Sequence, residues 1–122
     1  MTINSKLDLS YLETMSMGNT NTMITLLEAL LSELKSDQHT ARKLCEQKDW
    51  VGLERFCHHY KSTLSFSGDK ALINANLKLW DCAIKYLENK EVNPKDVQQQ
   101  LTIMERNGQK VAQEVSRILK NL

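Results

Sequence analysis

The sequence contains few of the residues that interrupt helices or crosslink a chain. One proline and four glycines occur among its 122 residues. Because these residues are the strongest helix and turn breakers, their scarcity favours long helices with few tight turns. The cysteine count is odd, and Cys45, Cys57 and Cys82 include no Cys-x-x-Cys pair. This spacing argues against a disulfide framework or a zinc site and indicates reduced thiols.

Long apolar runs and a strong charge of one sign are also absent. No stretch approaches the roughly 18 consecutive apolar residues of a membrane span, and residues 1–6 lack the apolar region of a signal peptide. The formal net charge is only +1, without the clustered basic residues of a nucleic-acid-binding surface. We therefore expect a cytoplasmic protein that makes no direct contact with nucleic acid or membrane.

Apolar residues at helical spacing fill most of the chain. They recur every three or four residues, and no segment alternates with period two, so we expect one all-α domain over residues 1–122. Long amphipathic helices with short connections favour an antiparallel four-helix bundle with an additional short N-terminal helix as a lid. The predicted ranges are about 9–16 for the short helix, then 22–47, 50–66, 70–87 and 94–121.

Several helix ends carry local signals. Asp49 and Asp69 are candidate N-caps of the helices that begin at residues 50 and 70, and Asp8 is a candidate N-cap of the first helix. Asn93 followed by Pro94 is the clearest helix start in the chain. In the last helix, a glycine at position 108 fills a gap in the apolar seam. We expect it to let a neighbouring helix approach closely, although glycine costs about 1 kcal/mol against alanine.

The residues able to carry chemistry gather in the stretch 54–65. At about 100° per residue, His58 points about 130° away from the apolar face of this helix. His59 lies on the other flank, so only His58 shares a face with Lys61. Helical spacing predicts one largely polar stripe made of Glu54, His58, Lys61, Ser62 and Ser65.

This stripe suits phosphoryl transfer. A neutral, exposed imidazole is a nucleophile, and Lys61 offers a cation beside an arriving phosphoryl group. Ser62 is small and leaves the histidine open to a partner, and Ser65 can donate a hydrogen bond. The chain has no Gly-rich phosphate loop, no metal-ligand set and no Ser/His/Asp arrangement. A partner would therefore have to bring the rest of the active site.

The same stretch resembles the signature of histidine phosphotransfer (HPt) domains, His-x-x-Lys-(Gly/Ser)-(Ser/Thr) with a glycine ten positions after the histidine. Residues 58–63 read HHYKST, and the tenth residue after His58 is Gly68. Many members have glycine where Ser62 stands, which bears on how closely a partner docks. Leucine is common where Tyr60 stands, on the inner face of the helix.

Sequence outside this signature is also similar to the HPt family. Residues 49–53, DWVGL, resemble its "DW-x-x-L" entry to the histidine-bearing helix. Residues 8–12, DLSYL, and the pair Gly18-Asn19 resemble its start. The resemblance covers residues 7–121, almost the whole chain.

The resemblance implies a place in a bacterial two-component phosphorelay. His58 would accept a phosphoryl group from the aspartate of one response-regulator receiver domain and pass it to another, with Lys61 as the assisting cation. The outer ring nitrogen, Nε2, is the expected nucleophile. Mg²⁺ belongs to the receiver, so the chain would need no cofactor or metal. It would be a monomeric phosphoprotein and a phosphoryl carrier rather than an enzyme, either alone or within a membrane-bound hybrid sensor histidine kinase.

A receiver would dock on an exposed apolar patch around the histidine, rimmed by polar groups. We expect this patch to come from the first helix and the start of the second. The candidate residues are Leu12, Met15, Met17 and Met23.

An alternative from another class stays open. The chain would then be a non-catalytic helical adaptor that binds a receiver or another partner without phosphoryl transfer, and His58 would be incidental. We interpret His39 and His59 as solvated surface residues. We interpret Trp50 and Trp80 as anchors inside the bundle.

Overall fold

The computed structural model describes residues 9–122, which form six α-helices with no strand among them. The expected all-α class is therefore confirmed. None of these helices is long and apolar enough to cross a membrane. In chain order they are α1 (Ser10–Ser16), α2 (Thr20–Ser36), α3 (Thr40–Glu46), α4 (Trp50–Ser65), α5 (Lys70–Leu87) and α6 (Pro94–Lys120).

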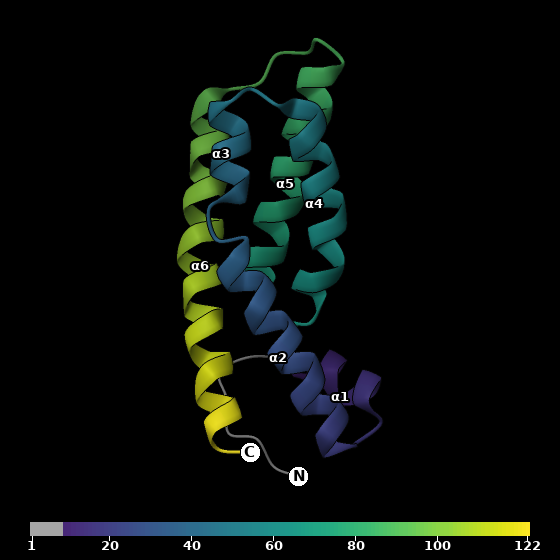
Figure 1. The fold of residues 1–122 in the computed structure, drawn as a ribbon. Coiled ribbons are helices and arrows are strands. Elements are labelled where there is room, and N and C mark those ends of the chain that lie inside the picture. Colours follow the sequence, from purple (N-terminus) through teal and green to yellow (C-terminus); the bar gives the residue numbers. More distant parts are fainter. Residues whose placement is uncertain (1–8) are drawn as a thin grey trace.

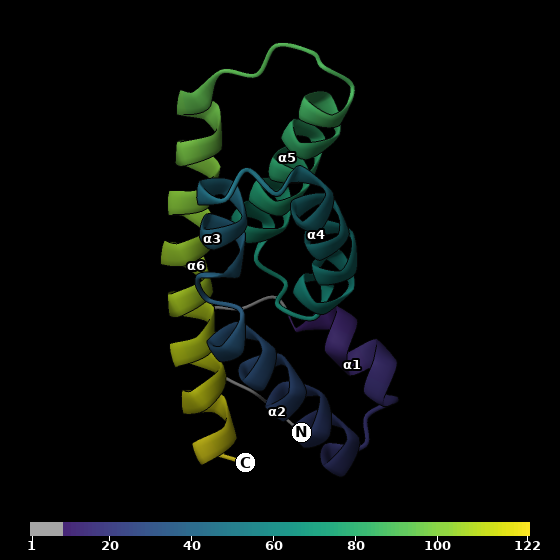
Figure 2. The ribbon, with the colours of Figure 1, turned by 45° about the horizontal axis from the view of Figure 1, so that its top comes forward.

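The longest helix, α6, runs along the whole length of the molecule (Figure 1). Figures 1 and 2 both show α2 and α3 following one another on one side of it. Helices α4 and α5 lie side by side, and α5 also packs against α6. Helix α1 packs against α2 at the same end of the molecule as the C-terminus (Figure 1).

A single cluster of buried side chains joins the helices. Side chains with no exposed surface come from five of them and include Leu12 of α1, Leu27 of α2, Leu53 of α4, Leu79 of α5 and Val111 of α6. Burying one such side chain contributes about 1.5–3 kcal/mol, so the apolar stripe that each helix presents to the core supplies most of the stabilisation.

The expected continuous helix over residues 22–47 is wrong, because the chain turns at residues 37–39 between α2 and α3. The apolar stripe is interrupted there, since polar Asp37 and Gln38 occupy the turns between Leu34 and Ala41. Serine and aspartate compete with helical hydrogen bonds through their own side chains. Without an apolar contact to hold this turn on the core, the helix ends and restarts.

Three predicted N-caps are confirmed. The side chains of Asp49, Asp69 and Asn93 each accept a hydrogen bond from a backbone N–H of the first turn, at 2.9, 2.8 and 3.0 Å. Such a cap contributes about 1 kcal/mol. Gly68, after α4, has the positive φ of 63° that glycine adopts at a helix end. The candidate cap Asp8 lies outside the described residues.

The expected role of Gly108 in close helix packing is wrong. A Cβ atom placed on Gly108 would meet no neighbouring atom within 4 Å, apart from its own stretch of helix. No other helix therefore requires a glycine at this position. Gly108 instead borders a surface groove between α6 and the α2–α3 segment.

We predict that Gly108→Ala raises the free energy of unfolding by about 1 kcal/mol, because alanine is the better helix former and its methyl group has room. Urea unfolding measures the change. Gly52→Ala is the matched control: its Cβ would lie 2.5 Å from Oδ2 of the capping Asp49, so this variant should lose stability. A stability loss in Gly108→Ala would contradict the open space.

Candidate functional site

His58 lies on the solvent-exposed side of α4, as the helical stripe predicts. The residues beside it in the sequence differ sharply in exposure, since Cys57 is completely buried and Tyr60 is 4% exposed. Within residues 9–122, neither ring nitrogen of His58 makes a hydrogen bond. Both nitrogens are therefore open to a reaction partner in this structure.

The imidazole of His58 is held by Trp80 of α5. The two rings are nearly parallel, at 8°, with centroids 5.1 Å apart. Such an aromatic pair contributes about 0.5–1.5 kcal/mol beyond the area it buries. Stacking fixes the plane of the imidazole without occupying either nitrogen. The interpretation of Trp80 as an interior anchor is therefore incomplete, because this half-buried indole also forms one wall of the site.

The same indole organises two further groups of the predicted stripe. Its Nε1–H donates a hydrogen bond to Oε1 of Glu54, at 3.2 Å, which orients the ring. The Nζ atom of Lys61 lies 5.9 Å from the indole centroid, within the range of a cation–π contact. Trp80 thus brings His58, Lys61 and Glu54 together on the outer side of the α4–α5 pair.

The two predicted serines have different surroundings. Ser62 is exposed next to Lys61 and leaves the approach to His58 open. Ser65 Oγ donates a hydrogen bond to the backbone carbonyl of Lys61, at 3.0 Å. Its hydroxyl is therefore engaged within the helix, and the expectation that it donates toward a phosphoryl group has no support from this conformation.

The other two histidines lie elsewhere. His59 is exposed on the flank of α4 that faces Asp37. Burial raises the pKa of the Asp37 carboxyl, and the charge of a protonated His59 opposes that rise. His39 has a side chain that is 72% exposed and lies 3.4 Å from a carboxylate oxygen of Glu105. Both side chains are exposed, which confirms their predicted placement on the surface. Neither lies beside Trp80 as His58 does.

Half of the expected docking patch is wrong. Leu12 and Met23 are 0% and 1% exposed and belong to the core. Met15 and Met17 are exposed, at 50% and 91%, but they lie at the end of α1, which packs against α2. Position in the chain does not determine which face a short helix turns toward the core.

Exposed apolar surface on the same flank as Trp80, the partner of His58, comes instead from α5. Leu77 is 37% exposed and precedes Trp80 by one turn on the same flank of the helix. Ile73 and Ile84 continue this line and are half-buried. Their spacing of four, three and four residues is visible in the sequence as a second apolar stripe on α5. This second stripe is the feature of the sequence that could have identified Trp80 and Leu77 as residues of the site.

The thiols of Cys57 and Cys45 do not compete with His58 as nucleophiles. Burial raises the pKa of the Cys57 thiol to about 12 and that of Cys45 to about 11, so neither thiol is ionised near neutral pH. Within residues 9–122, no group of three or more His, Cys, Asp or Glu side chains is arranged to hold a metal ion. An exposed imidazole beside an ammonium group can act as a nucleophile toward an anionic electrophile.

We predict that Trp80→Leu moves the ring-proton NMR signals of His58 downfield, toward those of His59, because protons above a stacked indole are shifted upfield by its ring current. Leucine retains the apolar bulk at this position. Trp50→Leu is the control, since Trp50 stacks on Tyr86 with centroids 3.9 Å apart and should leave His58 unchanged. His58 signals that do not respond to Trp80→Leu would contradict the stacked arrangement.

Comparison of the chain with protein-family models, with curated proteins and with solved structures gave no match. The description of the site therefore depends on its geometry alone. The site consists of an exposed, stacked imidazole with a lysine one turn away, on the outer side of two packed helices.

Proposed function

We propose that this chain is a histidine-containing phosphotransfer module of a two-component phosphorelay. His58 is its phosphoryl acceptor. The observation that carries the proposal is the exposed imidazole of His58, stacked on Trp80, with both nitrogens open and with Lys61 bound to the same indole. The HPt-like motif around these residues is independent support. A match to the motif depends on the sequence alone, and it does not require His58 to be exposed or to stack on Trp80.

The transfer proceeds by in-line displacement at phosphorus. The lone pair of one His58 ring nitrogen attacks the aspartyl phosphate of a receiver, the phosphorus–oxygen bond breaks, and the receiver carboxylate leaves with the bonding electrons. The second ring nitrogen keeps its proton during attack. Lys61 stabilises the charge on the phosphoryl oxygens. Transfer onward reverses these steps with the aspartate of a second receiver, and each receiver supplies its own Mg²⁺.

The fold that fits this function is an antiparallel four-helix bundle. We propose that α2 and α3 together form one broken arm of it, and that α4, α5 and α6 form the other three, with α1 as the additional short helix. The packing of α4 on α5, α5 on α6 and α2 on α6 supports this reading. Helix α3 is tied to α6 by Arg42, whose guanidinium donates two hydrogen bonds of 2.8 Å to the carboxylate of Glu105.

The receiver is proposed to dock over the outer side of the α4–α5 pair. Leu77 and the exposed edge of Trp80 offer apolar surface, and Lys61 and Ser62 form part of a polar rim. This small surface suits a transient partner that must leave after each transfer. The module is proposed to act in the cytoplasm, as a free carrier or as part of a hybrid sensor histidine kinase, and to contact no nucleic acid.

The adaptor alternative makes a different prediction for the same surface. A pure adaptor binds a receiver through Leu77 and Trp80 but needs no nucleophile at position 58. Binding and labelling therefore separate the two functions. An adaptor would bind a receiver and carry no phosphoryl group.

We predict that incubation with a phosphorylated receiver places an acid-labile, alkali-stable label on the chain. His58→Gln should abolish the label, because it removes the nucleophile and keeps a polar side chain of similar size. His59→Gln is the matched control and should retain it. Absence of label on the unmodified chain across a panel of receivers would favour the adaptor, and label that survives His58→Gln would exclude His58 as the acceptor.

We predict that Lys61→Gln slows phosphotransfer by about tenfold to a hundredfold, the equivalent of about 1.5–3 kcal/mol for one charge-assisted hydrogen bond. Rapid-quench measurement of label on His58 gives the rate. Lys70→Gln is the control, since Lys70 is an exposed lysine at the start of α5. Equal rates in the two variants would remove Lys61 from the site.

A further inference from the structure

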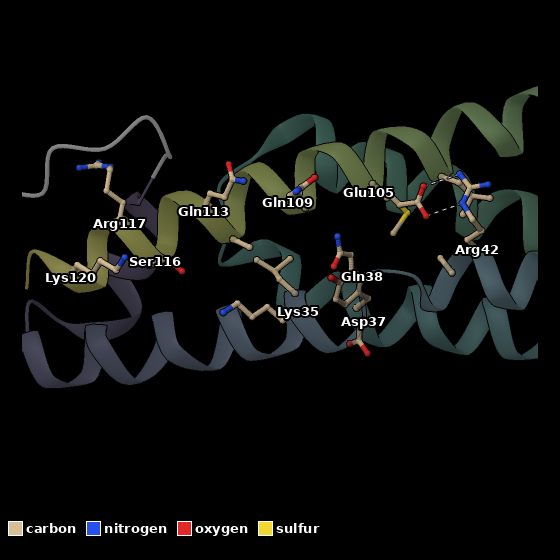
Figure 3. Close-up of a pocket in the computed structure, with 17 residues that line it drawn as sticks. Lys35, Asp37, Gln38, Arg42, Glu105, Gln109, Gln113, Ser116, Arg117 and Lys120 are labelled. Atoms are coloured by element: carbon tan, nitrogen blue, oxygen red, sulfur yellow. Dashed lines mark hydrogen bonds and ion pairs between the residues drawn. The ribbon is translucent and has the colours of Figure 1, made fainter.

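A groove of about 500 Å³ lies between the α2–α3 segment and α6 (Figure 3). This volume is within the range of about 300–1,000 Å³ typical of small-molecule sites. Tyr60 contributes to the groove from α4, and Gly108 borders it from α6. None of the residues of the His58 site lines it, so the groove is a separate feature of the molecule.

The floor of the groove is apolar except at one point. Five apolar side chains line it together with the ring of Tyr60. Tyr60 is 4% exposed, and its hydroxyl makes no hydrogen bond within the described part of the chain. Its oxygen is not fully buried, since Asn76 Oδ1 is the one buried side-chain oxygen or nitrogen without a partner among the described residues. A ligand oxygen in the groove can therefore reach the hydroxyl and accept its hydrogen bond. The five apolar residues are Leu34, Ala41, Leu101, Met104 and Ala112.

The two ends of the groove differ in charge. At one end Arg42 and Glu105 neutralise each other through a two-pronged ion pair. Lys120 lies at the other end beside Ser116, and Lys35 lies farther in, across the groove from Gln113 (Figure 3). Neither lysine forms an ion pair with any residue in the range 9–122. That end of the groove is therefore suited to an anion.

The walls between the two ends carry amide groups. Gln38 comes from the turn between α2 and α3, and Gln109 and Gln113 come from α6 (Figure 3). Amide side chains both donate and accept hydrogen bonds, so they complement an amide of a ligand. The groove thus combines an apolar floor with a wall of amide groups, which also carries the carboxylate of Asp37, and with two lysines toward the end near Ser116.

We propose that this groove binds a free single-chain amphiphile of the N-acyl amino acid kind. Its acyl chain lies on the apolar floor, its amide lies among the glutamines with Tyr60 as a donor to the carbonyl, and its carboxylate lies between Lys35 and Lys120. Charge complementarity selects the anionic head, since the remaining lysines are unpaired. An acidic peptide would need a longer apolar face, and an inorganic anion would leave the floor empty.

The test is titration of the full chain with N-dodecanoylglycine below its micelle concentration, followed by calorimetry and by amide NMR. We expect saturable one-to-one binding with shifts at groove residues. Dodecanoate, which lacks the amide, should bind more weakly, and Tyr60→Phe should reduce that difference. Absence of saturable binding, or binding only above the micelle concentration, would overturn the proposal.

Matched variants locate the ligand. Gly108→Leu should abolish binding by filling the groove, and its thermal unfolding shows whether the variant stays folded. The double variant Lys35→Gln/Lys120→Gln should weaken binding at least tenfold, whereas Lys110→Gln, on an exposed part of α6, should leave it unchanged. Binding that resists both groove variants would place the ligand elsewhere. The readout is binding alone, so it is independent of phosphoryl transfer to His58.

Discussion

The packing of α4 against α5 places every group of the candidate site. Asn76 of α5 is 1% exposed, and its side-chain amide donates a hydrogen bond of 2.9 Å to the backbone carbonyl of Cys57 in α4. Trp80 follows one turn later on α5, at the level of His58. Because a buried polar contact of this kind is satisfied only at one register, it fixes which residue of α4 the indole faces. The Oδ1 atom of Asn76 has no partner within the described residues, so this register carries a cost.

Stacking on Trp80 holds the His58 ring and leaves both of its nitrogens open. A hydrogen bond to one nitrogen would fix the tautomer and block that atom. The Trp80 face instead restrains the plane of the imidazole at a modest free energy, about 0.5–1.5 kcal/mol for an aromatic pair. Lys61 rests on the same indole and can leave it, because a cation–π contact at an exposed site contributes only about 0.5–1 kcal/mol. These contacts order His58 and Lys61 before a partner binds, and they are weak enough to let both side chains adjust to it.

Helix α4 separates two features that face different neighbours. One flank carries His58 and meets α5, and the other carries Tyr60, which closes the floor of the groove beside α6. The break between α2 and α3 shapes that groove, since the turn at residues 37–39 supplies part of its wall. Gly108 has no packing contact with another helix that accounts for its cost in a helix, and it borders the groove.

The sequence alone determined the features that depend on a residue and its near neighbours in the chain. The 3.6-residue period placed the helices and their inner faces, local side-chain hydrogen bonds placed the caps at Asp49, Asp69 and Asn93, and the same period separated His58 from His59. Only the tertiary structure decided that Trp80 stacks on His58, that Leu12 and Met23 are buried, and that Gly108 borders a groove. Each of these outcomes depends on which helix lies opposite, and helical periodicity gives the angle of a side chain but not the neighbour it meets.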